Sequence, residues 1–136
     1  MKRSPLKKVS KKPISTMKRK LWKEFSLFIR NRDNFTCFVC GKKGEGGGMH
    51  AGHFIPKSVC GIELYFSELN VNAQCYHCNI NLGGNGAAYY RKMVTRHGQE
   101  AVDNIFDIKD KHHANPSKWS IEDYEEKIAH YKELNK

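Results

Sequence analysis

Two Cys-x-x-Cys pairs constrain the fold of this chain more than any other feature of its sequence. Cys37 and Cys40 form the first pair, and Cys75 and Cys78 form the second. A gap of two residues lets two thiolates from one tight turn reach the same ion, and zinc takes four sulfur ligands in a tetrahedron. One structural Zn²⁺ would therefore join both ends of the segment between the pairs. Such an ion contributes on the order of 10 kcal/mol or more to folding.

The compartment bears on whether these cysteines bind metal. The basic N-terminus is not followed by an apolar run long enough for a secretory signal or a membrane span. We therefore expect a reducing, cytoplasmic location, where paired cysteines bind metal more often than they form disulfides. Free thiols are the alternative, and a redox pair is disfavoured because no βαβ pattern surrounds either pair. We expect the fifth cysteine, Cys60, to be a packed thiol, although His77 could replace one sulfur ligand.

The charge of the chain indicates its class of partner. Among 136 residues the formal net charge is +10, and the isoelectric point is about 9.5. Such an excess favours a polyanionic partner, most often nucleic acid, although a solvated basic surface is the plainer alternative. Residues 1–16 are rich in Lys, Ser and Pro and contain no acidic residue, so we expect a flexible basic arm that contacts phosphates loosely. Residues 17–136, at ordinary domain size, form one domain.

The spacing of apolar residues predicts a mixed α+β fold. Two short segments have strand character and should pair as a hairpin, residues 50–56 and 69–74. Helical spacing predicts four helices, at about 17–32, at 89–97, around 101–106, and after a capping box that runs from Ser120 to Asp123. Gly98 is a plausible helix stop. We interpret Trp22 and Phe25 of the first helix as core residues.

A second pattern of polar residues lies between and beside the cysteine pairs. It runs His50-Ala51-Gly52-His53-Phe54-Ile55-Pro56-Lys57-Ser58, with Asn70 before the second pair and Asn79 directly after it. Together with residues 28–30 and 98–103, it resembles the HNH or His-Me finger nucleases. More closely, it resembles the phage NinG/Rap recombination endonucleases, which act on branched DNA. The resemblance covers roughly residues 27–131 and implies a zinc-stapled ββα-metal core with flanking helices.

The resemblance also implies roles for individual residues. His53 takes the role of general base, Asn70 helps to hold the His53 loop, and Asn79 gives its side-chain oxygen to a catalytic Mg²⁺ or Mn²⁺. His50 is a weaker candidate for this ion. Some relatives have Asp three residues before the base, or directly before it, where this chain has His50 and Gly52. Ligation by His50 would favour a softer ion such as Mn²⁺ or Ni²⁺.

The chemistry of phosphodiester hydrolysis fits these residue types independently. A neutral histidine with an ordinary pKa of about 6.5 is a suitable base at cytoplasmic pH. A divalent ion polarises the phosphate and stabilises the leaving oxygen, and Mg²⁺ keeps several waters, so one or two protein oxygens suffice. Strict strand alternation would place His50 and His53 on opposite faces, so we expect a bend near Gly52.

Several assignments keep alternatives. Asn70 could be a turn former, Asn72 competes with it as the orienting residue, and Asn81 or Asn85 could reach the ion. Four basic residues are candidates for phosphate contact without base reading: Lys57, Arg91, Lys92 and Arg96. We therefore expect structure-selective cleavage of branched DNA, for which a homodimer would be suited. The alternatives are a non-catalytic zinc-knuckle module that binds nucleic acid, a nuclease that acts on RNA, and a homing-type enzyme.

Overall fold

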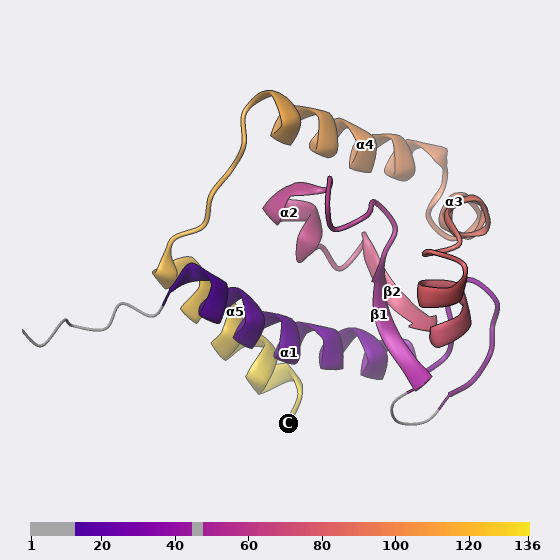
Figure 1. The fold of residues 1–136 in the computed structure, drawn as a ribbon, viewed down its shortest axis with the longest axis horizontal. Coiled ribbons are helices and arrows are strands. Elements are labelled where there is room, and N and C mark those ends of the chain that lie inside the picture. Colours follow the sequence, from indigo (N-terminus) through magenta and orange to yellow (C-terminus); the bar gives the residue numbers. More distant parts are fainter. Residues whose placement is uncertain (1–12, 45–47) are drawn as a thin grey trace, which may run out of the picture.

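A computed structural model describes residues 13–44 and 48–136 of the chain (Figure 1). Helices surround a two-stranded antiparallel sheet, which confirms the α+β class. The elements in chain order are α1 (Ile14–Arg32), β1 (Met49–His53), α2 (Gly61–Tyr65), β2 (Val71–Cys75), the π-helical turn η2 (His77–Asn81), α3 (Gly86–His97), α4 (Gln99–Ala114) and α5 (Ile121–Leu134). In these described ranges, no helix combines the length and apolar character that a membrane span requires.

Helix α1 confirms the first predicted helix but begins earlier. Residues 14–16, which we had assigned to the basic arm, form its first turn after Pro13, a residue whose fixed φ suits a helix start. The rest of the predicted arm, residues 1–12, lies outside the described residues. The helix ends as predicted before Asn34, which has a positive φ of 53°. A residue in that conformation cannot continue a right-handed helix.

The predicted hairpin is confirmed as an antiparallel pair of β1 and β2. The register runs without interruption from Met49 opposite Cys75 to His53 opposite Val71. β1 ends at His53, before the predicted end at Pro56, and bends and turns follow it. The segment between the strands contains the short helix α2, which was not among the predicted helices.

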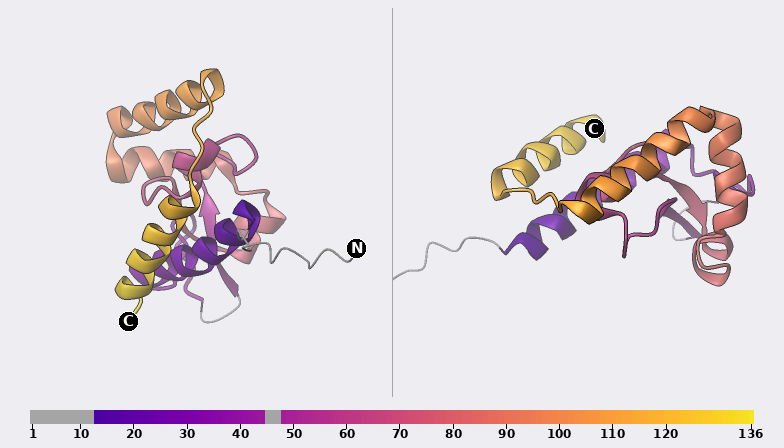
Figure 2. Two further views of the ribbon diagram at one scale, coloured as in Figure 1. Left: turned by 90° about the vertical axis from the view of Figure 1, so that its left-hand side faces the viewer. Right: turned by 90° about the horizontal axis from the view of Figure 1, so that it is seen from above.

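Two apolar clusters pack on the sheet from opposite sides. One joins α1 and α5 to the strands through Phe25, Ile29 and Val71. The other contains three of the paired cysteines (Cys37, Cys75 and Cys78) and residues of α2, α3 and α4, with Tyr89 and Met93 fully buried in it. Figures 1 and 2 show the sheet and α2 between α4 on one side and the α1–α5 pair on the other.

The predicted helix ends near the C-terminus are also confirmed. Gly98, with a φ of 87°, separates α3 from α4. Ser120 and Asp123 form the capping box at the start of α5, because each side chain accepts a hydrogen bond from the backbone N–H of the other, at 3.1 and 2.8 Å. Helix α5 is held in place on α1 by its buried tyrosines, Tyr124 and Tyr131.

Candidate functional site

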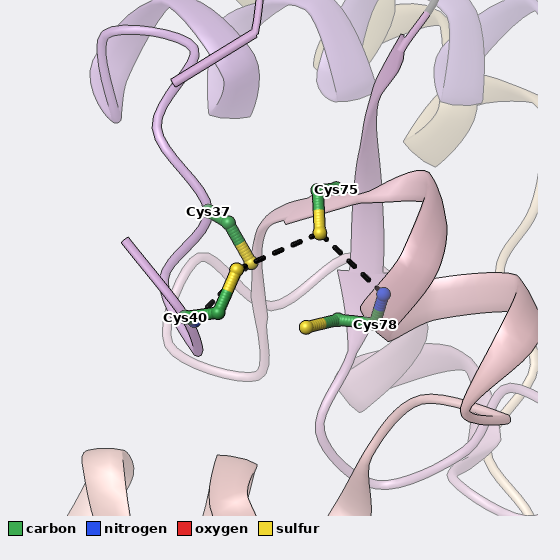
Figure 3. A group of neighbouring side chains, drawn as sticks. All are labelled: Cys37, Cys40, Cys75 and Cys78. Carbon is green, nitrogen blue, oxygen red and sulfur yellow. Dashed lines mark hydrogen bonds between the residues drawn. The ribbon is translucent and has the colours of Figure 1, made fainter. Parts of the chain in front are cut away.

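The four paired cysteines meet at one point, as the sequence predicts. Their sulfur atoms all lie within 4.8 Å of one another, and those of Cys40 and Cys75 are 3.7 Å apart (Figure 3). A zinc ion with bonds of about 2.3 Å to four sulfurs would space them about 3.8 Å apart. The cluster can therefore hold a metal ion such as zinc. Cys60 is a buried thiol outside the cluster, and His77 is not part of it either.

Backbone hydrogen bonds shape both cysteine turns for a metal ion. The N–H of Cys40 points at the sulfur of Cys37 at 3.5 Å, and the N–H of Cys78 points at the sulfur of Cys75 at 3.4 Å. Such contacts stabilise a thiolate, which is the form that binds metal. The Phe38 N–H donates to a carbonyl of β2 at 2.7 Å, so the first turn is attached to the strand that leads into the second.

A cavity of about 560 Å³ brings together four of the predicted site residues: His50, His53, Lys57 and Asn79. The histidines come from β1, Lys57 from the segment after it, and Asn79 from η2, directly after the last cysteine. Because η2 begins next to Cys75 and contains Cys78, a metal ion in the cysteine cluster would also fix the position of Asn79. The position of Asn79 in the cavity wall is thus linked to the geometry of the cysteine cluster.

One hydrogen bond and the burial of the ring determine the protonation of His53 in this cavity. Its Nε2 lies 2.9 Å from the carbonyl oxygen of Tyr65. A carbonyl only accepts, so Nε2 carries the proton of the neutral ring and Nδ1 has the free lone pair. Burial, aided by the ammonium groups of Lys57 and Lys18, lowers the pKa of His53 to about 4, against the opposing effect of the Tyr65 hydrogen bond. The ring is therefore neutral at physiological pH.

The side chains of His50 and Asn79 contact each other in the same cavity. The Asn79 amide lies 3.0 Å from Nδ1 of His50. We expected a bend near Gly52 to bring the two histidines to one side of the strand. The register is continuous through Gly52, yet both histidines line the cavity, His50 from near the start of β1 and His53 from its last residue.

Asn70 contacts the loop after His53 from inside the fold. The side chain is fully buried and does not line the cavity. Its oxygen accepts from the N–H of Ile55 at 2.8 Å, and its amide donates to the carbonyl of Leu64 at 2.9 Å. Leu64 directly precedes Tyr65, whose carbonyl contacts His53. Asn70 is thus placed to orient His53 rather than to touch a substrate.

Asn72, the competing candidate, has a different set of contacts. Its amide donates to the hydroxyl of Tyr89 at 2.9 Å, and that hydroxyl donates to the carbonyl of Gly52 at 2.8 Å. Its oxygen accepts from Arg32 at 3.0 Å. Asn72 therefore joins the middle of β1 to α3 and α1. None of these hydrogen bonds involves the loop after His53.

The predicted basic residues do not gather at one place. Lys57 lines the cavity with His53. Lys92 and Arg96 instead line a second cavity beside the first cysteine pair, where the Arg96 guanidinium lies 5.3 Å from the ring centre of Phe38. Arg91 is exposed on α3 and lines neither cavity. We had placed Arg91, Lys92 and Arg96 near the site because they are near it in sequence. In the fold, α3 packs against α4 and the cysteine turn rather than beside His53.

One wall of the His53 cavity consists of residues that the sequence analysis missed. Trp22, which we had interpreted as a core residue, is half-buried, and its ring stacks on His53 with 5.1 Å between ring centres and an interplanar angle of 16°. Ser26 and Arg30 follow on the same face of α1. A spacing of four residues from Trp22 to Arg30 is a signal that could have identified this face.

Comparisons with known proteins give the family. A family model described as "Bacteriophage Lambda NinG protein" matches residues 2–136. Protein ninG of Escherichia phage lambda is 31% identical over 129 residues, which cover 94% of this chain and 60% of that protein. Protein ninG of Escherichia phage 933W is 31% identical over 119 residues, or 87% of this chain and 56% of that protein. Protein ninG of Salmonella phage P22 is 29% identical over 129 residues, with coverages of 94% and 60%.

The matches cover nearly all of this chain but only part of each relative. No solved structure matches the chain. The chain spans between 56% and 60% of the length of these curated relatives, and the family model matches all of it except the first residue. The cysteine pairs and the residues of the His53 cavity all lie inside the matched range. The chain belongs to the NinG family.

Proposed function

We propose that this chain is a metal-dependent DNA endonuclease of the HNH or His-Me finger type, with β1, β2 and η2 as its ββα-metal core. The observation that carries the proposal is the meeting of His53, His50 and Asn79 in one cavity. A protein that only binds nucleic acid has no need to keep a neutral imidazole in one cavity with an amide and a second imidazole.

In this proposal His53 is the general base. Its Nδ1 takes a proton from the water that attacks the phosphorus, and the positive charge then formed on the ring is stabilised by the hydrogen bond from Nε2 to the Tyr65 carbonyl. The stacked ring of Trp22 keeps the imidazole in one orientation. A positioned general base accelerates such a reaction by about 10²–10⁴-fold.

The donor groups of the cavity suit a divalent ion that accepts both oxygen and nitrogen ligands. Asn79 offers an amide oxygen and His50 an imidazole nitrogen, and no carboxylate is among the described residues that line the cavity. When bound, the ion would polarise the phosphate and stabilise the leaving 3′ oxygen. A mixed oxygen and nitrogen set favours Mn²⁺, although Mg²⁺ with most of its waters retained is compatible.

The substrate in this proposal is branched or junction DNA, cut during phage recombination in the cytoplasm of the bacterial host. The net charge of +10 supports a nucleic-acid partner. Lys57 and Arg30 line the cavity and can hold phosphates without reading bases. The preference for branches is supported by the resemblance to the NinG/Rap endonucleases, and a symmetric dimer would suit a substrate with two arms.

The experiment that tests this function compares nuclease activity on several substrates. Purified protein is incubated with plasmid, a synthetic four-way junction and an RNA of matched sequence, with and without Mg²⁺ or Mn²⁺. We expect metal-dependent cutting of the junction, reduced by about two orders of magnitude or more in His53→Ala. His130→Ala, which changes an exposed histidine outside the cavity, is the matched control. Binding without cutting under every metal condition would instead establish the non-catalytic zinc-knuckle module.

A further inference from the structure

The side chain of Gln74 contains a buried oxygen without a partner. Gln74 is fully buried, and its Oε1 has no hydrogen-bond partner among the described residues. Its Nε2 donates to the carbonyl of Gly84 at 2.9 Å. Because a carbonyl accepts only, this contact fixes which end of the amide is nitrogen, and the oxygen must face away from Gly84. Buried acceptors without a partner are rare and call for an explanation.

The unpartnered oxygen occupies the space above Gly52. A Cβ on Gly52 would collide with Oε1 of Gln74, and it would lie 3.1 Å from Oδ1 of Asn79. Gly52 does not have a positive φ, so its backbone conformation does not require glycine. A side chain at this position is excluded instead by the amide of Gln74, and the amide oxygens of Gln74 and Asn79 both lie near the point that its Cβ would occupy.

This space borders the cavity that holds His53. Gln74 lies directly opposite His50 in the sheet, and directly opposed residues of an antiparallel pair project to the same face. His50, the strand partner of Gln74, and Gly84, its hydrogen-bond partner, both line the cavity, as does Asn79. Gln74 itself is fully buried and does not line the cavity, so its unpartnered oxygen lies directly behind the wall that these residues form, not deep in an apolar core.

We propose that Gln74 is an oxygen ligand of the divalent ion, paired with Asn79, at the place that a side chain of residue 52 would otherwise fill. The ion's part in cleavage rests on the proposed function, whereas its binding does not. Amide oxygens are suitable ligands for Mg²⁺ and Mn²⁺. Because both amides are neutral, the ion keeps its charge for phosphate oxygens and binds weakly in the absence of DNA.

The test measures Mn²⁺ binding to the zinc-loaded full chain without DNA, by the loss of the free Mn²⁺ signal in electron paramagnetic resonance. Gln74→Leu and Gln74→Met remove the oxygen with little change in volume, and we expect each to weaken Mn²⁺ binding about tenfold or more. Gln74→Glu supplies a charged oxygen, and we expect it to strengthen binding about tenfold. Zinc content and the far-ultraviolet circular dichroism spectrum show whether each variant is folded.

A purely structural role for Gln74 makes the opposite prediction for the glutamate variant. A carboxylate cannot donate to the Gly84 carbonyl, so Gln74→Glu would then lose stability and gain no Mn²⁺ affinity. Equal Mn²⁺ affinity in all folded variants, or no Mn²⁺ binding by the unmodified chain, would overturn the inference. Binding that depends on Gln74 without any DNA cleavage would sustain the inference and reject the endonuclease. DNA cleavage together with Mn²⁺ affinity that does not change in the Gln74 variants would reject the inference and sustain the endonuclease.

Discussion

The ring of His53 combines properties that a solvent-exposed histidine does not have. One nitrogen is fixed as a donor by the Tyr65 carbonyl, one ring face is covered by Trp22, and burial keeps the ring neutral. In the proposed reaction, a depressed pKa makes His53 a weaker base but keeps the ring in its unprotonated, reactive form at physiological pH.

This environment predicts the pH dependence of the proposed cleavage. A base is active when unprotonated, and burial lowers the pKa of His53 to about 4, so activity should persist as pH falls below the ordinary histidine value of about 6.5. We predict that the acid limb of single-turnover cleavage in Mn²⁺ has its midpoint well below 6.5. Lys57→Ala removes a positive charge that depresses this pKa and should move the limb to higher pH. A limb at 6.5 in the unmodified chain would contradict this account.

At the scale of elements, the cysteine cluster joins parts of the chain that are far apart in sequence. It connects the turn after α1 to the end of β2 and to η2, and η2 contains Asn79. An irregular π-helical turn followed by Gly83 and Gly84 has little intrinsic stability. We therefore expect its geometry, and with it the cavity, to depend on a metal ion bound by the four sulfurs.

Substitution of one sulfur ligand tests this dependence. We predict that Cys75→Ser lowers bound zinc and the free energy of unfolding together, because a structural ion contributes on the order of 10 kcal/mol. The control is Cys60→Ser, which changes a buried thiol outside the cluster and should retain zinc. Measurements are zinc content by mass spectrometry and urea unfolding. A chain that folds normally after zinc removal would refute the structural role of the ion.

The elements also show which features the sequence could predict. The cysteine cluster, the strand pair and the four long helices were predicted, because fixed spacings and apolar periodicity are local signals. Three features of the site depend on tertiary packing and have no such signal: the carbonyl of Tyr65, the oxygen of Gln74 and the position of Lys92. The short helix α2 also escaped prediction, because five residues are too few for a periodic pattern.

At the scale of the whole molecule, charge and geometry have separate roles. In the proposed function, the net charge of +10 attracts the DNA polyanion without fixing where it binds. Within the His53 cavity the positive groups are Lys57 and Arg30, whereas Lys92 and Arg96 lie at the second cavity. Most basic residues should therefore contribute to affinity, and only those two to the placement of the phosphate that is cut.

Salt titrations separate these two contributions. Each phosphate neutralised by the protein lowers the slope of log affinity against log salt by about 0.9. We predict that Lys57→Ala makes this slope shallower by about one contact and also slows cleavage, whereas Lys92→Ala changes affinity with little effect on the rate at saturating DNA. Fluorescence anisotropy with a junction and single-turnover cleavage provide the two readouts. Equal effects of both substitutions on the cleavage rate would contradict the separate roles.

The central claim is that Nδ1 of His53 takes the proton from the attacking water, and chemical rescue tests it most directly. His53→Gly leaves a space where free imidazole can bind, and single-turnover junction cleavage in Mn²⁺ is measured as imidazole is added. We predict that the variant cuts about 100-fold or more slowly than the unmodified chain, and that imidazole restores cutting in proportion to its unprotonated fraction. Cleavage by His53→Gly at the unmodified rate, without any response to imidazole, would contradict the claim.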